Sequence, residues 1–331
     1  MKIQDGEHLL EVMRGYQVPC VIAAAIDLGV FDTLSVPRTG REVSELTTCD
    51  ERGMTILLDA LAALGFIRKE GNRYRLSEQL EPLLLRDSPQ SVVPMLRHQA
   101  SCLRRWTRLP WTIKTGSPGD AGPSPRGEEA DQEAFIQAMH VVSRDVAPAL
   151  IPEINPGGIR CILDLGGASG SWTLAWLDSE PGARAIIFDL PHVIPMAKSR
   201  VSQSSVADRV DYVAGDFYSD PLPSGVDLAW VSAIIHQNSR KQNRDLFARI
   251  AEALEPPGWI YIRDVVLDAS RTSPVAGALF AVNMLAATEY GNSYTFEDIE
   301  SDLRAAGFGS VELVRRDPGM HSIVRARLAE K

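Results

Sequence analysis

The sequence predicts an α/β fold with a doubly wound, mostly parallel sheet in residues 156–331, preceded by a mostly helical domain in residues 1–110. Three observations predict this division. Short apolar runs alternate with helical patterns after residue 156, which is typical of βαβ units. A Gly-rich turn, Asp164–Gly170, connects the first of these runs to a helix. The last two apolar runs are separated by a Pro-Gly turn and therefore predict a hairpin.

In the first domain, apolar residues at helical spacing predict four helices before residue 65. Residues Phe66–Leu76 follow as two strands around the turn Glu70-Gly71-Asn72. Helices followed by a hairpin form the outline of a winged helix, an element that often binds DNA. The segment in the place of a recognition helix, Asp50–Ala63, is mostly apolar, whereas a major-groove reader needs polar and basic side chains. We therefore expect this domain to bury an apolar face, in its core or against a partner chain.

A connecting segment is expected at residues 111–155. Its first part, Lys114–Asp131, is rich in Gly, Pro and Ser and predicts a loop. A helix is expected from Gln132 to about Leu150. The run Pro152–Gly158 then marks the start of the α/β domain.

The α/β domain contains five predicted strands and four principal helices. The strands are expected at Ile159–Leu165, Ala183–Asp189, Val210–Ala214, Val226–Ser232 and Trp259–Val266. The helices are expected at Ser171–Leu177, Val193–Val201, Arg240–Leu254 and Phe296–Gly307. A terminal hairpin, Ser310–Arg315 with Ser322–Leu328, adds a reversed strand, which distinguishes this fold from that of the dinucleotide-dependent dehydrogenases.

The composition limits the classes of function. The net charge of −9 argues against nucleic-acid binding, which requires a basic face. The four cysteines are far apart and form no CxxC pair, so neither a metal site nor a disulfide framework is expected. No uninterrupted run of roughly 18 apolar residues and no signal peptide is found, so we expect no membrane span and a cytoplasmic location.

Three elements predict a nucleotide-like cofactor at the carboxyl edge of the sheet. The turn Asp164–Gly170 allows backbone N–H groups to approach a ligand at a helix N-terminus. Asp189 closes the next strand, roughly 20 residues beyond the turn, where an acid accepts hydrogen bonds from ribose hydroxyls. Asp216 and Phe217 follow the third strand, where they are suited to an adenine amino group and ring face. The spacing of the glycines and the terminal hairpin disfavour a nicotinamide-dependent oxidoreductase.

His236 is the candidate catalytic residue. It follows the apolar strand Val226–Ser232 and precedes the polar run Gln237–Arg240, so it is expected at the ligand-binding edge of the sheet. A lone histidine is more often a capping or core residue. Here its position relative to the cofactor motifs favours a role as general base, which a neutral imidazole fills well near neutral pH.

The segments Phe188–Pro191, Gly215–Tyr218 and Ile234–His236 resemble motifs of the S-adenosylmethionine-dependent small-molecule O-methyltransferases, which include plant phenolic, acetylserotonin and bacterial natural-product enzymes. The resemblance covers essentially the whole chain. It implies a Rossmann-like class I methyltransferase sheet with a terminal reversed β-hairpin, and an N-terminal winged-helix-like domain that forms a homodimer. It also implies S-adenosyl-L-methionine as the cofactor and methylation, favoured at oxygen, of a small aromatic acceptor.

The resemblance further implies roles for individual positions. The cofactor-binding residues would be Asp164, Gly166, Gly170, Asp189, Leu190, Gly215, Asp216, Phe217 and Ser232. The acceptor-binding residues would be Met139, His140, Phe280, Met284 and Thr288. His236 would be the general base and Asp264 the acid that orients it. Ser232 stands where many relatives carry a lysine.

Two departures from the plant enzymes concern the candidate base. The plant His-Asp-Trp motif corresponds here to His236–Asn238. Of the two glutamates that frame the plant histidine, the first corresponds to the shorter Asp264 and the second to Ser293, with Glu289 close enough in sequence to substitute. A less firmly held imidazole would be a weaker base. Methylation at carbon or nitrogen therefore stays open, as does a relative that binds the cofactor but performs decarboxylation, hydroxylation or cyclisation.

Overall fold

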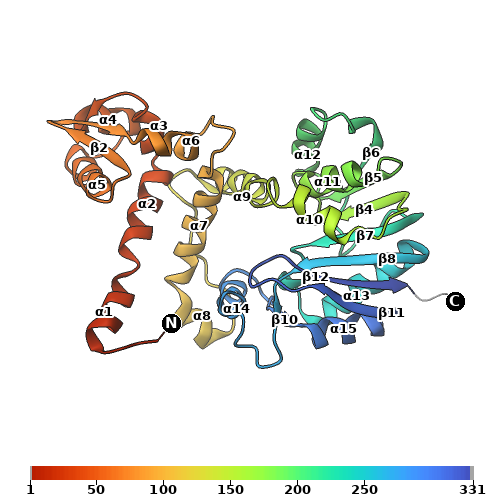
Figure 1. The fold of residues 1–331 in the computed structure, drawn as a ribbon. Coiled ribbons are helices and arrows are strands. Elements are labelled where there is room, and N and C mark those ends of the chain that lie inside the picture. Colours follow the sequence, from red (N-terminus) through yellow and green to blue (C-terminus); the bar gives the residue numbers. More distant parts are fainter. Residues whose placement is uncertain (1, 329–331) are drawn as a thin grey trace. The chain divides into compact units, whose positions relative to one another are not determined.

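In the computed structural model, which describes residues 2–328, contacts divide the chain into two compact units. The first contains the residues up to Arg104 together with 121–141, and the second contains 105–120 together with the chain from 142 onward. Figure 1 labels the helices and strands of both units. All four cysteines are free thiols.

The first unit has the elements of a winged helix. Its helices are α1 (Gly6–Arg14), α2 (Gln17–Asp27), α3 (Val30–Thr33), α4 (Gly40–Thr47), α5 (Glu51–Ala63), α6 (Glu81–Leu84), α7 (Val93–Trp106) and α9 (Glu128–Ser143), the last two each continuing two residues into the second unit. Its antiparallel sheet has the order β1-β3-β2, from β1 (Arg38–Thr39), β2 (Ile67–Glu70) and β3 (Arg73–Leu76). The predicted hairpin is confirmed, and its turn holds Gly71 at a φ of 61°, where glycine is least strained.

The sequence specifies the ends of these helices locally. Thr39 and Glu42 form a capping box at the start of α4, with the Glu42 amide donating to Thr39 Oγ1 at 3.2 Å. Asp50 caps α5 by accepting from the Gly53 amide at 2.7 Å. The inner face of α5 then buries Leu58 and Leu61 completely against the hairpin and α2. The apolar stripe of this segment is thus partly explained by the core.

The first two helices expose other apolar side chains. The residues that are at least half exposed there are Leu9, Leu10, Met13 and Tyr16. Within residues 2–328, the helical stretch Gly6–Asp27 is the one that is long and apolar enough, by length and composition alone, to cross a membrane. Its apolar residues do not form an uninterrupted run, because Glu11 and Arg14 lie within it. The described part of the chain therefore leaves this apolar surface exposed.

The second unit is built around a seven-stranded sheet with the order β11-β12-β8-β7-β4-β5-β6. Its strands are β4 (Cys161–Leu165), β5 (Arg184–Asp189), β6 (Val210–Ala214), β7 (Val226–Ser232), β8 (Leu254–Asp264), β11 (Phe308–Arg315) and β12 (Ser322–Leu328). Strands β4 to β8 are parallel to one another, and β12 is antiparallel to both β8 and β11. The predicted doubly wound sheet with a terminal reversed strand is confirmed.

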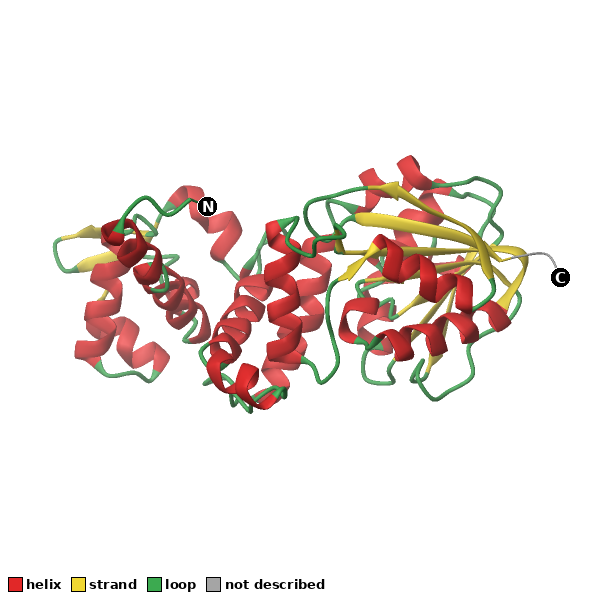
Figure 2. Ribbon diagram, turned by 90° about the horizontal axis from the view of Figure 1, so that it is seen from below, coloured by secondary structure: helices red, strands yellow, loops and turns green. Residues whose placement is uncertain are grey.

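Helices cover both faces of this sheet (Figure 2). One core forms under α10 (Ala147–Ile154), α11 (Ser171–Ser179) and α12 (Ile194–Val201), where Trp176 and Trp230 are fully buried. The opposite core forms under α13 (Arg240–Ala253) and α15 (Phe296–Ala305). The remaining elements are α8 (Leu109–Thr115), α14 (Val275–Ala287) and a short parallel pair, β9 (Val266–Leu267) with β10 (Tyr294–Thr295). Burial on both faces explains why the central strands are apolar throughout.

Several predicted boundaries were wrong. Helix α3 adds a fifth helix before residue 65, and α9 begins at Glu128, inside the segment Lys114–Asp131 that was expected as a loop. The single helix expected from Gln132 to Leu150 is two helices, α9 and α10, separated after Ser143. Pro148 lies in the first turn of α10 and cannot supply the amide that an uninterrupted helix would need there. Strand β8 begins at Leu254 rather than Trp259, because Leu254 already pairs with Val226 of β7.

Candidate functional site

The Gly-rich turn after β4 is tightly packed against the sheet. Gly166, Ala168 and Gly170 all have positive φ values, of 67°, 44° and 75°. The Gly166 amide donates to the Phe188 carbonyl at 2.8 Å, which ties the turn to β5. A Cβ atom at position 170 would lie 2.7 Å from Val201 Cγ2, so the turn needs glycine there for space as well as for conformation. Helix α11 begins directly after it and directs its amide end toward the carboxyl edge of the sheet.

Asp164 lies beneath the turn. Its side chain is 1% exposed and accepts a hydrogen bond of 2.5 Å from Thr173 Oγ1 in the first turn of α11. Burial raises the pKa of Asp164 to about 7, and the nearby charge of Asp189 adds to the rise. This placement joins β4 to α11 and suits a residue that holds the turn in shape.

Asp189 ends β5 beside the turn. Its carboxylate accepts from the Ala168 amide at 2.8 Å and from the Leu190 amide at 2.7 Å. Burial raises the pKa of Asp189 above its ordinary value, although these two hydrogen bonds oppose the rise. Each carboxylate oxygen still has a lone pair for a further donor, which is the requirement for binding two ribose hydroxyls. Leu190 is 40% exposed at the same edge.

The segment after β6 approaches the same edge. The Gly215 amide donates to the Asp189 carbonyl at 2.9 Å, and a Cβ atom at position 215 would lie 2.6 Å from Phe188 Cζ. Asp216 is half-buried and accepts from the Tyr218 amide at 2.9 Å. The Phe217 ring lies beside Gly166, since a Cβ atom there would be 3.7 Å from Phe217 Cε1. The structure therefore brings the turn and both predicted acids to one edge.

His236 lies in a short 3-10 turn, Ile235–Gln237, after β7. Its Nδ1 atom is 2.8 Å and 3.0 Å from the two carboxylate oxygens of Asp264, which ends β8. The side chains are 13% and 1% exposed, respectively. The Val265 amide donates to Asp264 Oδ1 at 2.8 Å and fixes that carboxylate further. With Nδ1–H donated to Asp264, the imidazole presents Nε2 as a proton acceptor.

Within residues 2–328, neither Ser293, at the position of the second plant acid, nor Glu289 forms a hydrogen bond with this imidazole. The Ser293 hydroxyl is buried and donates to the Gly277 carbonyl at 3.0 Å. Glu289 is exposed, and its hydrogen bond with Tyr290, together with its charge, raises the pKa of that tyrosine. Among residues 2–328, Asp264 is the carboxylate that pairs with His236. The orienting role considered for Glu289 is therefore not supported.

The loop that carries His236 is anchored by Asn238, which the sequence did not single out. Asn238 is 1% exposed; its amide donates to Asn243 Oδ1 at 2.9 Å, and its Oδ1 accepts from the Tyr218 hydroxyl. The Tyr294 hydroxyl donates to the Asn238 carbonyl, and Asn243 donates to the Ile235 carbonyl at 3.1 Å. The loop is thus bonded on both sides of His236.

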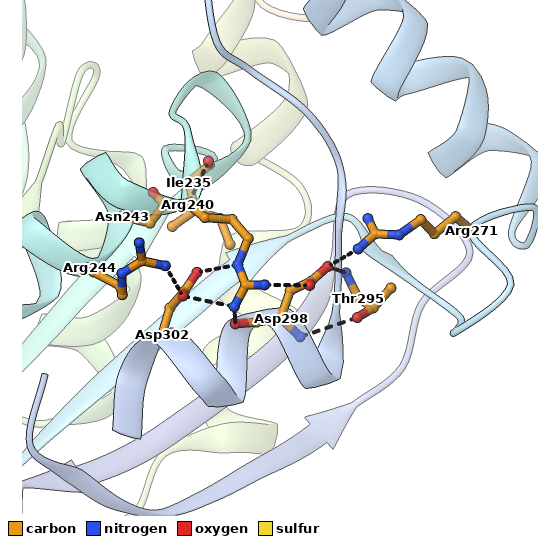
Figure 3. A network of polar contacts seen from close by, with 8 residues as sticks. All are labelled: Ile235, Arg240, Asn243, Arg244, Arg271, Thr295, Asp298 and Asp302. Atoms are coloured by element: carbon orange, nitrogen blue, oxygen red, sulfur yellow. Dashed lines mark hydrogen bonds and ion pairs between the residues drawn. The ribbon is translucent and has the colours of Figure 1, made fainter. Parts of the chain in front are cut away.

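A second polar network continues from this loop across α13 and α15 (Figure 3). Arg240 contacts Asp298 Oδ1 at 3.0 Å and both oxygens of Asp302 at 2.9 and 3.0 Å. Arg244 adds a 3.0 Å contact to Asp302, and Arg271 a 2.6 Å contact to Asp298. Because Arg271 lies in the loop before α14, the network joins the His236 loop, α15 and the start of α14.

The predicted acceptor residues fall in both units. Phe280 on α14 meets the His236 ring edge-on, with centroids 4.8 Å apart at 88°. Met284 is buried on the same helix, and Thr288 donates from its hydroxyl to the Met284 carbonyl at 2.7 Å. Met139 and His140 lie on α9 and are half-buried. The ring contact therefore places Phe280 against the candidate base.

The residues of the edge fit S-adenosylmethionine by their chemistry. Gly166 and Gly170 let a ligand approach the backbone closely. The carboxylates of Asp189 and Asp216 can accept hydrogen bonds, which matches a ligand with ribose hydroxyls and an adenine amino group. No group of three or more His, Cys, Asp or Glu side chains in residues 2–328 is arranged to hold a metal ion.

Comparisons with known proteins decide the family. A family model described as the O-methyltransferase domain matches residues 124–309, and a model of the O-methyltransferase dimerisation domain matches residues 10–84. The chain belongs to the O-methyltransferase family. It is an S-adenosylmethionine-dependent methyltransferase with the class I fold, as the sequence motifs predicted. The predicted N-terminal dimerisation domain is likewise confirmed.

Relatives of known activity match over nearly the full chain. The 3-hydroxy-5-methyl-1-naphthoate 3-O-methyltransferase of Streptomyces sahachiroi is 30% identical over 326 residues, covering 96% of this chain and 93% of its own. Bovine acetylserotonin O-methyltransferase is 30% identical over 346 residues, covering 98% and 99%. The N,N-dimethyltransferase OxyT of Streptomyces rimosus is 27% identical over 317 residues, covering 92% and 91%. The crystal structure of human N-acetylserotonin methyltransferase in complex with SAM superposes with a TM-score of 0.83 at 25% identity over all of both chains.

Proposed function

We propose that this methyltransferase transfers the methyl group of S-adenosylmethionine to a hydroxyl of a small aromatic molecule, with His236 as the general base. The observation that carries the proposal is the contact of His236 Nδ1 with both oxygens of the buried Asp264, at the edge that holds the cofactor motifs. This contact supports an imidazole that is oriented and held as the tautomer with a free Nε2.

The chemistry asks little of the protein beyond alignment and proton removal. When bound, S-adenosylmethionine supplies a methyl group already activated by its sulfonium. A phenol has a pKa of about 10 and is mostly protonated at neutral pH. His236 Nε2 would accept the hydroxyl proton as the oxygen takes up the methyl group, whose bond to sulfur would break to leave S-adenosylhomocysteine. Asp264 would stabilise the imidazolium that forms. Alignment of acceptor and methyl group alone can supply roughly 7–11 kcal/mol of the barrier reduction.

The cofactor is assigned to the carboxyl edge of β4, β5 and β6. Asp189 would accept from the ribose hydroxyls, and Asp216 from the adenine amino group, with Leu190 and Phe217 against the base. Gly166, Gly170 and Gly215 would allow close approach of the backbone, with Asp164 supporting the turn from below. The hydrogen-bonding capacity of both half-buried acids supports this assignment.

The aromatic acceptor is inferred from α14 and from the relatives. Phe280 packs in a T-shaped contact against the His236 ring, with Met284 further along the same helix and Thr288 at its C-cap. Met139 and His140 are assigned to the acceptor by their matching positions. The naphthoate and acetylserotonin named for the relatives are both aromatic, which supports a flat acceptor. The likeness to a dimethyltransferase named for nitrogen methylation keeps an amine acceptor as the second candidate.

The test is incubation of the enzyme with isotope-labelled cofactor and a panel of phenols, quinones, tetrapyrroles and amines, followed by mass analysis. Transfer of label to a phenolic oxygen is the expected result. Label on nitrogen would assign the amine acceptor, and label on carbon would assign the carbon methylation that the sequence left open; either result would refute methylation at oxygen. Consumption of an acceptor with loss of carboxyl, gain of oxygen or ring closure, and without label, would show non-methylating chemistry and refute the proposal.

We infer that the chain works as a cytoplasmic homodimer and binds no nucleic acid. The exposed apolar side chains of α1 and α2 lie in or beside the matched dimerisation region and support an interface there rather than a membrane span. Light scattering at micromolar concentration should give the mass of a dimer. Leu10→Glu combined with Met13→Glu should give a monomer, whereas Val314→Glu, at an exposed position of β11, should leave the dimer intact.

A further inference from the structure

Arg263 is a buried cation at the carboxyl end of β8, immediately before Asp264. The residue is only 3% exposed. Its Nη1 atom donates to Ser232 Oγ at 2.7 Å and its Nε atom to His321 Nδ1 at 3.2 Å. The guanidinium also stacks over the Trp172 ring, with Cζ 4.7 Å from the ring centroid. Burial lowers the pKa of Arg263 to about 10, which leaves it charged near neutral pH.

Within residues 2–328, no carboxylate oxygen lies within 4.0 Å of the Arg263 guanidinium, since none of the ion pairs includes it. Its hydrogen-bond partners, Ser232 and an accepting His321 nitrogen, are both neutral. By contrast, Arg104, which is also largely buried, pairs with Asp27 and Asp131 at 2.9 and 3.2 Å. The charges of Asp264 and Asp317 act on Arg263 from beyond this distance, but neither carboxylate forms a hydrogen bond with the guanidinium. Because a buried cation is costly unless an anion pairs with it directly, Arg263 is suited to receive one from outside the chain.

The order of the strands indicates which part of the cofactor would reach Arg263. The sheet runs β8-β7-β4-β5-β6, with Ser232 of β7 paired in register with Arg263 of β8. A cofactor with its ribose at Asp189 of β5 and its adenine at Asp216 after β6 extends its other end past the turn after β4 toward β7. Trp172, which contacts the guanidinium, lies in the first turn of α11, two residues beyond Gly170. Arg263 is thus on the side of the cofactor's amino-acid end.

We propose that Arg263 binds the carboxylate of the methionine moiety of S-adenosylmethionine, held in place by Ser232 and Trp172. A guanidinium matches a carboxylate with two parallel hydrogen bonds. With Nε donating to His321 and one N–H of Nη1 donating to Ser232, the other N–H of Nη1 and those of Nη2 are left for the carboxylate. The proposal deepens the proposed function and rests on its placement of ribose and adenine. It adds a specific anchor for the end of the cofactor that carries the reactive sulfonium.

The test compares two ligands by calorimetry on the full-length protein. S-adenosylhomocysteine has the amino-acid carboxylate, and 5′-methylthioadenosine lacks it while keeping the ribose, adenine and thioether. Arg263→Gln should raise the Kd for S-adenosylhomocysteine by about ten- to a hundredfold, as expected for a charge-assisted hydrogen-bonded pair. It should leave the Kd for 5′-methylthioadenosine within about threefold, because the carboxylate is the only group affected. Circular dichroism and the unfolding temperature report whether the variant is folded.

Three further variants make the result specific. Arg263→Lys keeps a cation and should lose less affinity for S-adenosylhomocysteine than Arg263→Gln, which also covers the case in which the glutamine variant fails to fold. Ser232→Ala removes the hydroxyl that accepts a hydrogen bond from the guanidinium. It should weaken the binding of S-adenosylhomocysteine and leave the binding of 5′-methylthioadenosine unchanged. Arg160→Gln, at an exposed arginine before the amino end of β4, is the matched control and should change neither affinity.

The possible results distinguish the role of Arg263 from the placement of the cofactor. If Arg263→Gln weakened the binding of both ligands equally, the role of Arg263 would be purely structural, and the proposal would be overturned. Unchanged binding of S-adenosylhomocysteine, with a raised KM for the acceptor, would assign the guanidinium to an acceptor carboxylate and also overturn it. If neither ligand bound to the unaltered protein, the placement of the cofactor on which the proposal rests would instead be refuted.

Discussion

Asp264→Asn tests the base more directly than removal of the histidine. In the native pair, His236 Nδ1 faces both Asp264 oxygens, and Oδ1 also accepts from the Val265 amide. An asparagine would keep its oxygen on the Val265 amide and turn its NH2 toward Nδ1. Nδ1 would then have to accept, so the proton would move to Nε2, where it blocks general-base catalysis. The substitution changes no volume and leaves the cofactor edge unaltered.

The magnitude follows from the bond that is lost. A hydrogen bond to a charged group contributes about 1.5–3 kcal/mol, and 1.4 kcal/mol is a factor of ten, so kcat should fall about ten- to a hundredfold. The assay is single-turnover methyl transfer to the acceptor identified by the panel, between pH 6 and 9 by design, with the Kd for S-adenosylhomocysteine measured beside it. Glu289→Gln, at an exposed carboxylate, should be neutral. A folded Asp264→Asn enzyme with native kcat would refute the role of the pair.

Three other changes test the cofactor edge and the networks around it. Asp189→Asn should raise the Kd for S-adenosylhomocysteine, measured by calorimetry, about ten- to a hundredfold. Asp211→Asn, which changes an exposed acid on β6, should leave this Kd unchanged. Equal increases in Kd for the two variants would contradict the assignment of Asp189 to the ribose. Because the folded-state pKa of Asp164 is raised to about 7, its contribution to stability is greatest in acid and is lost as the pH rises toward 7. The unfolding temperature of Asp164→Asn, relative to the native protein, should therefore increase between about pH 4 and 7 and level off above, and a pH-independent difference would argue against the raised pKa. Arg240→Met should lower the free energy of unfolding by about 1–3 kcal/mol in urea, because it leaves the buried Asp302 with Arg244 alone, while Arg304→Met, which removes an exposed i,i+4 pair, should cost less than about 0.5 kcal/mol.

Much of the fold could be predicted because its signals are local. The strand Val210–Ala214 and the starts of α11, α13 and α15 were predicted to the residue, since each depends on a nearby turn, cap or apolar run. The division between α9 and α10 was missed because one proline among good helix formers is a weak signal in sequence. The early start of β8 depends on pairing with Val226, a contact that lies far away in the chain.

The site was predictable where a residue follows a strand and not where a contact crosses between loops. Asp189, Asp216 and His236 are all at strand ends, so the topology alone brings them to one edge. Asn238 and Arg263 were missed because their partners, Tyr218, Tyr294 and His321, are 20 or more residues away and belong to other loops. Their one signal in sequence is position: Asn238 lies two residues after His236, and Arg263 lies one residue before Asp264.

The pairing of His236 with Asp264 across adjacent strands has a consequence for how such an enzyme can diversify. The base, its acid and the hydrogen bonds that fix their loop belong to the sheet edge, to the loops beside it and to the first turn of α13. Helix α14 meets the base through Phe280 alone among the ring contacts described for His236. Mutations at positions of α14 other than Phe280 can therefore reshape the space for the acceptor without displacing the proton acceptor. Reactivity and recognition can evolve separately on this scaffold, and libraries directed at new acceptors would do best to vary that helix and spare the strand ends.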